Sequence, residues 1–131
     1  MLPRTRYLAR LMGLTLTILA LSELLRRQAT MDAAASMTKE TGMLWLAGLA
    51  TLASGLAVVL AHNIWRGGLA TVLVTVLGWM AAFKGAAVLL VPAPCWVAMI
   101  DVGGYARFYY VYAAIPTVLG AYLVWAGLAD E

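Results

Sequence analysis

Three ionisable side chains lie in or beside long apolar stretches of the sequence, and they are the candidates for chemistry. They are Glu23, Lys84 and His62. An ionisable side chain inside a bilayer is costly, so its presence there predicts a functional role by default. In a four-span topology they lie toward the same side of the membrane, so Glu23 and Lys84 could form a buried ion pair or line a polar pathway.

Each of these residues also has a purely structural interpretation, which the sequence leaves open. Glu23 precedes Arg26 and Arg27 by three and four residues, the spacing of a local ion pair on a helix. Lys84 has a long aliphatic stem that can carry its ammonium group to the membrane surface. Lys84 is the stronger functional candidate because it lies deeper in its apolar stretch. Alanines three residues to either side of it suggest that this face points toward other helices.

Single histidine and cysteine residues limit the chemistry further. His62 is the only histidine, so a haem held by two histidines of one chain is excluded; a helix cap or an interfacial hydrogen bond would explain it. Cys95 is the only cysteine, which excludes an intrachain disulfide and favours a small packing residue. Asp101 and Arg107 either pair across the intervening Gly-Gly turn or belong to a solvated loop.

No combination of residues suggests catalysis. The three serines cannot be placed beside the histidine, and no glycine-rich phosphate-binding loop is present. We therefore predict no catalytic residue, no cofactor and no metal ion, and we do not expect an enzyme. The net charge of +3 comes from arginines at the ends of apolar runs, as in membrane anchoring, and predicts no nucleic-acid partner.

The composition places the chain in a lipid bilayer. Hydrophobic residues make up 64% of the 131 residues and charged residues 11%, whereas soluble domains carry about 25% charged residues. A chain this small could not hide so much apolar surface from water. We expect one all-α transmembrane domain over 1–131, a bundle of four transmembrane helices.

The apolar runs and their breaks give the boundaries of those helices. They predict helices over about 8–25, 43–61, 69–91 and 108–128. The polar stretch 26–42 has an Ala-rich middle that suits a short interfacial helix. Pro92 and Pro94 end the third span. The apolar piece 96–100 that follows is either an interfacial or a re-entrant segment.

Small residues recur at helical spacing in the spans, which predicts close packing between helices. The positions fall into three faces: Ala47, Thr51 and Gly55; Ala53, Ala57 and Ala61; Ala113, Thr117 and Ala121.

Lys and Arg residues number four on each side of a four-span topology, so their balance does not orient the chain. Arginines 4, 6 and 10 flank the first helix, which usually dominates, and favour cytoplasmic termini.

A pattern around the second and third spans carries a resemblance. It reads His62-Asn63-Ile64-Trp65, then Gly78-Trp79, Lys84-Gly85 and Pro92. This resembles a group of small, uncharacterised bacterial integral membrane proteins. The resemblance covers about residues 43–92. It implies a protein of the bacterial inner (plasma) membrane with about four spans, and it implies no activity.

Three functions remain as hypotheses. We favour an accessory or structural subunit, or a homo-oligomer, whose partners are the lipid bilayer and other membrane subunits or itself. A small transporter or channel using Lys84 and Glu23 is the alternative. A membrane enzyme ranks last, because the sequence offers no catalytic set.

Overall fold

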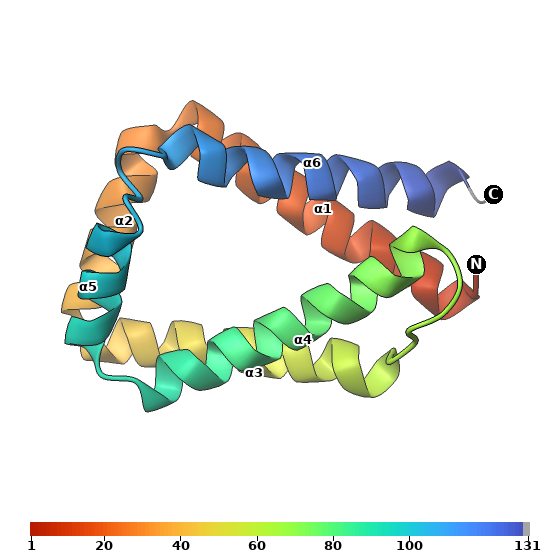
Figure 1. The fold of residues 1–131 in the computed structure, drawn as a ribbon, viewed down its shortest axis with the longest axis horizontal. Coiled ribbons are helices and arrows are strands. Elements are labelled where there is room, and N and C mark those ends of the chain that lie inside the picture. The colour runs from red at the N-terminus through yellow and green to blue at the C-terminus, as the bar shows by residue number, and fades with distance from the viewer. Residues whose placement is uncertain (130–131) are drawn as a thin grey trace.

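A computed structural model of the chain describes residues 1–129. Over these residues it contains six helices and no strands: α1 (Pro3–Leu25), α2 (Arg27–Lys39), α3 (Thr41–Ala61), α4 (Leu69–Leu90), α5 (Ala93–Val102) and α6 (Tyr109–Ala129) (Figure 1). Helices α1, α3, α4 and α6 are long and apolar enough to cross a membrane. The predicted all-α fold with four membrane-spanning helices is therefore confirmed.

The helix boundaries differ most from prediction at the start of the chain. Helix α1 begins at Pro3 rather than near residue 8, because proline suits the first helical position and arginines are good helix formers. The polar stretch 26–42 contains α2, so its Ala-rich middle is helical as expected. The apolar piece before the fourth span is also a helix, α5, which begins directly after Pro92.

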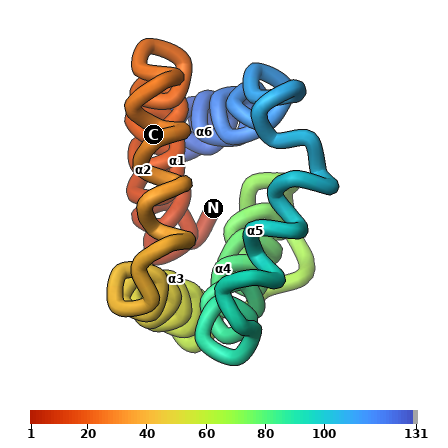
Figure 2. Tube along the Cα trace, turned by 90° about the vertical axis from the view of Figure 1, so that its left-hand side faces the viewer, coloured from red at the N-terminus to blue at the C-terminus, as the bar shows by residue number. Residues whose placement is uncertain are grey.

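The four long helices pack as two hairpins. Helix α1 lies against α6, and α3 lies against α4, with few contacts between the two pairs. The short helices α2 and α5 lie together at one end and connect the pairs (Figures 1 and 2). Seen from that end, α1 and α6 form one side of the molecule and α3 and α4 the other (Figure 2).

Two glycines allow the backbones of α3 and α4 to touch. A Cβ atom at Gly55 would overlap the backbone of Ala81 and Ala82, and one at Gly85 would overlap the backbone of Leu52. Close packing of this kind is what holds helices together in lipid, where burial of apolar surface gives no advantage. The α3–α4 hairpin is therefore specified by these small residues.

Glycines also allow close packing in the other hairpin, between α1 and α6. A Cβ atom at Gly13 of α1 would lie 2.7 Å from the backbone nitrogen of Val124, and one at Gly120 of α6 would lie 2.7 Å from Thr17 Oγ1. Two of the predicted small-residue faces are thus used within the chain, since Gly55 and Ala113 are both buried.

The hairpins meet near the start of α1. A buried cluster there joins Leu8 and Ala9 of α1, Ala70 and Val74 of α4, and Leu123 and Ala126 of α6. From this junction the hairpins diverge toward α2 and α5 (Figure 1). The molecule is thus narrow at the junction and wide at the α2–α5 end.

Two arginines of α1 bind the ends of other helices at the junction. Arg4 Nη1 donates to the carbonyl of Ala61 at 3.1 Å, and Arg10 Nε donates to the carbonyl of Gly127 at 2.8 Å. The last carbonyls of a helix have no partner within it and carry its negative dipole end, so a guanidinium group suits them. These arginines therefore connect helices, a role that the interpretation as headgroup anchors missed.

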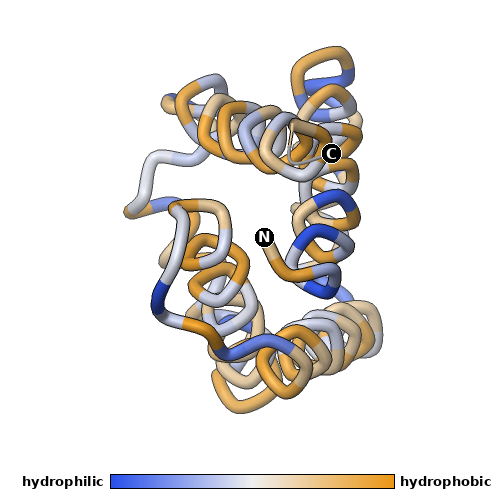
Figure 3. The backbone as a smooth tube through the Cα atoms, turned by 90° about the vertical axis from the view of Figure 1, so that its right-hand side faces the viewer, coloured by the Kyte–Doolittle hydropathy of each residue, from blue (hydrophilic) through white to orange (hydrophobic). Residues whose placement is uncertain are grey.

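The surface of the four long helices is apolar. Large side chains such as Leu60, Phe83 and Leu90 are exposed. Figure 3 shows hydrophobic residues along the long helices, with hydrophilic residues at the start of α1 and in the α3–α4 connector. Apolar outer faces with polar ends are what a bilayer requires of a multi-pass protein.

Candidate functional site

Lys84 lies on the face of α4 that turns toward the other hairpin. Leu73 and Leu77 of α4 pack against the buried cluster at the junction. Lys84 follows them by eleven and seven residues, which are close to three and two turns of an α-helix. It is therefore on the same face, beyond the point where α4 leaves the junction, and its side chain is exposed.

Glu23 occupies the matching position on α1. Met12 and Leu16 of α1 also pack against the junction cluster. Glu23 follows them by the same intervals of eleven and seven residues, so it shares their face, and its side chain is half-buried. Sequence analysis placed the two charges at the same side of the membrane, and the structure places them on facing sides of α1 and α4, which run in the same direction and diverge from the junction.

Glu23 and Lys84 also lie at the same distance along their helices from the junction. Glu23 and Lys84 each follow a buried alanine of the junction, Ala9 and Ala70 respectively, by fourteen residues. At 1.5 Å per residue both lie about 21 Å along their helices from the junction. They interact electrostatically across the space between α1 and α4, but no salt bridge or hydrogen bond joins their side chains.

The local ion pair predicted for Glu23 is absent, because Arg27 is engaged elsewhere. Arg27 Nη2 donates to the carbonyl of Ala106 at 3.0 Å. Its guanidinium carbon lies 5.5 Å from the ring centre of Tyr109 and 5.8 Å from that of Tyr110, within the range of cation–π attraction. Arg27 therefore holds the start of α6 and leaves the Glu23 carboxylate without a salt bridge.

Two tyrosines surround Glu23 at this end. The Tyr109 hydroxyl donates to the backbone carbonyl of Glu23, and the Tyr109 side chain is almost fully buried. Burial raises the pKa of Tyr105, and the negative charge of Glu23 adds to the rise. Tyr109 thus fixes the end of α1 against the start of α6.

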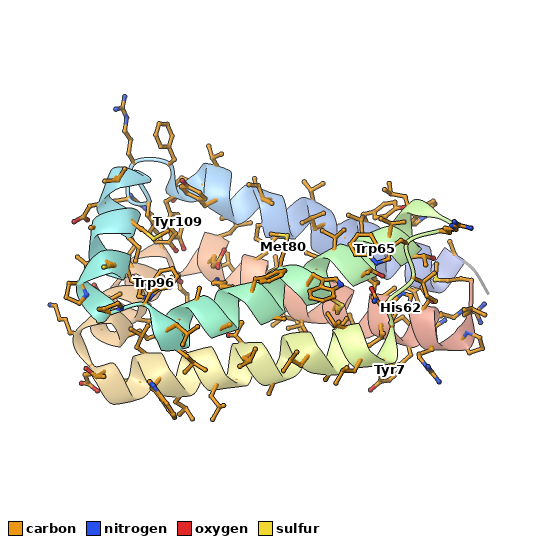
Figure 4. The ribbon with its side chains drawn as sticks, turned by 60° about the horizontal axis from the view of Figure 1, so that its bottom comes forward. Tyr7, His62, Trp65, Met80, Trp96 and Tyr109 are labelled. Carbon is orange, nitrogen blue, oxygen red and sulfur yellow. The ribbon has the colours of Figure 1, made fainter. Side chains whose placement is uncertain are left out.

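His62 is buried at the opposite end of the molecule, in the α3–α4 connector (Figure 4). Its backbone N–H donates to the carbonyl of Val58 at 2.7 Å, which ends α3 as a cap residue would. The predicted hydrogen-bonding role of the side chain is not seen, since neither ring nitrogen has a partner among the described residues. Burial lowers the pKa of His62; the nearby Thr71 carbonyl opposes this, and the charge of Arg4 adds to it.

The remainder of the His-Asn-x-Trp turn is a set of specific hydrogen bonds. Asn63 Oδ1 accepts from the indole N–H of Trp65 at 2.8 Å and from that of Trp79 at 3.2 Å. Thr75 Oγ1 accepts from the N–H of Ile64 at 3.2 Å and donates to its carbonyl at 2.8 Å. The turn and the Gly-Trp pair of the sequence pattern are therefore parts of one structural unit.

The α2–α5 end carries an open groove of about 660 Å³, with a mainly apolar lining. Asp101 and Arg107 line it, and no salt bridge joins them. Asp101 belongs to the last turn of α5 rather than to a loop, whereas Arg107 lies in the turn before α6. Arg107 lies over the ring of Phe108, 5.4 Å from its centre. Within residues 1–129 no group of His, Cys, Asp or Glu is arranged to hold a metal ion.

Comparison of the chain with known protein families, with curated proteins and with solved structures gives no match. The resemblance to small bacterial membrane proteins therefore stays a prediction. The site that the structure offers is the facing pair of charges, Glu23 and Lys84, on hairpins that diverge.

Proposed function

We propose that the protein is a structural membrane protein that assembles with a second copy of itself through the inner faces of its two hairpins. The observation that carries the proposal is the facing of Glu23 and Lys84 without a salt bridge between them. A charge inside a membrane is costly, and pairing with an opposite charge is one way in which proteins stabilise it. The hairpins in one copy diverge, so a second copy can supply the partner for each.

Helices α2 and α5 set the spacing of the hairpins at the wide end. Helix α2 has 13 residues and α5 has 10, so they hold the hairpins about 15–20 Å apart at 1.5 Å per residue. Packed helices lie 8–10 Å apart, and one inserted helix needs about twice that spacing. Met80 is 61% exposed and is seven residues after Leu73, which packs at the junction, so the inner face of α4 is uncovered at this depth.

Symmetry makes the two charges complementary between copies. In a twofold dimer, a contact of residue i with residue j is always accompanied by the contact of j with i. Lys84 of each copy would then meet Glu23 of the other, giving two ion pairs at matched depth. The outward face of Ala53, Ala57 and Ala61 on α3 also stays exposed and adds a second surface suited to close packing.

Charge reversal tests the assembly. The oligomeric state is measured in lipid nanodiscs or mild detergent by light scattering. Lys84→Glu or Glu23→Lys alone should give monomers, because like charges then face each other. The double variant K84E/E23K should restore the dimer. Lys39→Glu is the matched control, since Lys39 is exposed at the end of α2 and its reversal should leave the dimer intact. A monomeric wild-type protein, or single variants that remain dimeric, would contradict the proposal.

A second candidate is a small transporter or channel. The exposed side chain of Lys84 favours it, because Lys84 interacts electrostatically with Glu23 of the facing hairpin and the two could line a polar route. Lys84→Met should then abolish ion or solute flux into reconstituted vesicles. Unchanged flux in that variant would remove Lys84 from any such route.

We also propose that the protein resides in a bacterial inner membrane with both termini in the cytoplasm. The arginines at the start of α1 support this orientation. Cys95 gives a direct test, because it is exposed in α5, at the end of the molecule away from the start of α1 and the end of α6 (Figure 1). A membrane-impermeant maleimide added to intact spheroplasts should label Cys95. Labelling only after lysis would reverse the orientation.

A further inference from the structure

The contact between the two hairpins includes a buried imidazole. His62 is 1% exposed and follows α3 directly, next to Ala61, whose carbonyl accepts from Arg4 of α1. Thr71 of α4 lies on its other side, with its carbonyl near the ring but without hydrogen-bond geometry. Elements of both hairpins therefore surround this single side chain.

The charged groups near His62 are positive. Thr5, next to Arg4 in α1, is also 1% exposed, and its hydroxyl has no hydrogen-bond partner among the described residues. Arg4 is the charged group that acts on His62 from α1. Helix α3 has no ionisable side chain, and α4 has only Lys84, far along the helix. The connector adds Arg66, which is exposed. No carboxylate among residues 1–129 acts on the imidazole.

We propose that His62 is a pH-sensitive latch between the hairpins: the neutral imidazole keeps the junction closed, and its protonation separates the start of α1 from the end of α3. A protonated ring would carry its charge in a buried place beside the guanidinium group of Arg4. It would have two N–H donors and no carboxylate to receive them. Because His62 is 1% exposed in the closed junction, its charge becomes fully solvated when the two hairpins part and water enters.

The direction of the pH dependence follows from the two states of the junction. In the open state His62 contacts water, and its pKa is near the ordinary value of about 6.5. In the closed state burial lowers the pKa. The closed state is therefore fully stable above pH 6.5 and loses stability as the pH falls below it. The ratio of closed to open molecules falls by at most about tenfold per pH unit until the closed state itself binds a proton.

The opening can be measured as a distance between spin labels. In a Cys95→Ser background, labels are placed at Tyr7→Cys on α1 and Leu60→Cys on α3, two exposed positions near the junction. In nanodiscs we expect a second, longer distance between the labels to appear as the pH falls from 7.5 to 5. The population at this longer distance, relative to the shorter one, should rise by at most about tenfold per pH unit. A wild-type distribution that stays constant over this range would overturn the proposal.

Three controls separate the latch from other effects of acid. His62→Gln keeps a polar side chain that does not titrate, and its label distance should not change with pH; a transition equal to that of the wild type would exclude His62. A label pair within one hairpin, Leu46→Cys and Leu90→Cys, should stay constant, and its movement would indicate general unfolding instead. His62 is the only histidine, so its imidazole NMR signal titrates alone. A closed-state pKa at or above 6.5 would also overturn the proposal.

The latch does not rest on the proposed dimer. If the protein is a monomer whose label distance changes with pH, the result supports the latch and contradicts the proposed function. If it is a dimer that depends on Lys84 and Glu23 but has a label distance independent of pH, the result supports the function and contradicts the latch.

Discussion

The close approach of α3 and α4 gives a prediction whose size can be worked out. Changing Gly85 to alanine places a methyl group on the backbone of Leu52. Carbon atoms pack at about 3.5–4 Å, so the helices must separate by about 1 Å. Overpacking typically costs about 1–3 kcal/mol, and contact with backbone rather than a movable side chain favours the upper end.

Part of this cost is offset by the better helix propensity of alanine, which gains about 1 kcal/mol over glycine. The net loss in the free energy of unfolding is therefore about 2 kcal/mol, a change of about thirtyfold in the folding equilibrium. The control is Gly42→Ala in the first turn of α3, where an added Cβ meets nothing within 4 Å and only the propensity gain remains.

Both variants are compared by unfolding in mixed micelles with increasing dodecyl sulfate, followed by tryptophan fluorescence and far-UV circular dichroism. Three of the five tryptophans lie in this hairpin, Trp45 in α3, Trp65 in the connector and Trp79 in α4, so most of the fluorescence comes from it. If Gly85→Ala proves as stable as Gly42→Ala, the close approach of the two backbones at Leu52 is wrong.

Two further predictions concern the α3–α4 connector. Thr75→Val removes the hydroxyl that hydrogen-bonds the N–H and the carbonyl of Ile64. We expect the free energy of unfolding to fall by about 1–3 kcal/mol in the same assay. Wild-type stability would show that these two hydrogen bonds are not formed. Asn63→Ala leaves the indole N–H groups of Trp65 and Trp79 without their shared acceptor, which should cost about 1 kcal/mol and change the tryptophan emission in the folded protein. An emission spectrum identical to that of the wild type would show that Asn63 does not contact the indoles.

The fold was largely predictable because the spans are marked by continuous apolar runs. The helices at 43–61 and 69–91 match α3 and α4 within two residues, since a charge-free run and a short Gly-rich connector fix both ends. The start of α1 was not predictable from apolarity. Arginines end an apolar run but do not end a helix, and here they extend α1 by more than a turn.

The candidate site was predictable in its residues but not in its geometry. The cost of a charge in lipid singled out Glu23 and Lys84, and the four-span topology placed them on one side. Which helices pack together depends on steric fit between surfaces, such as Gly55 against Ala82, that is not visible in one span alone. The partners of Arg4, Arg10 and Arg27 were missed for the same reason, since each donates to a backbone carbonyl far away in sequence.

Mixing the two charge-reversal variants tests the proposed assembly most directly. Co-expressed Lys84→Glu and Glu23→Lys chains, each with a different affinity tag, can form both ion pairs only between copies. Within either chain alone the two charges are alike. We predict that the tagged chains co-purify as a mixed dimer, while each variant expressed alone is monomeric. Failure of the mixture to dimerise, with the K84E/E23K double variant intact, would show that Glu23 and Lys84 act within one chain and would contradict the account.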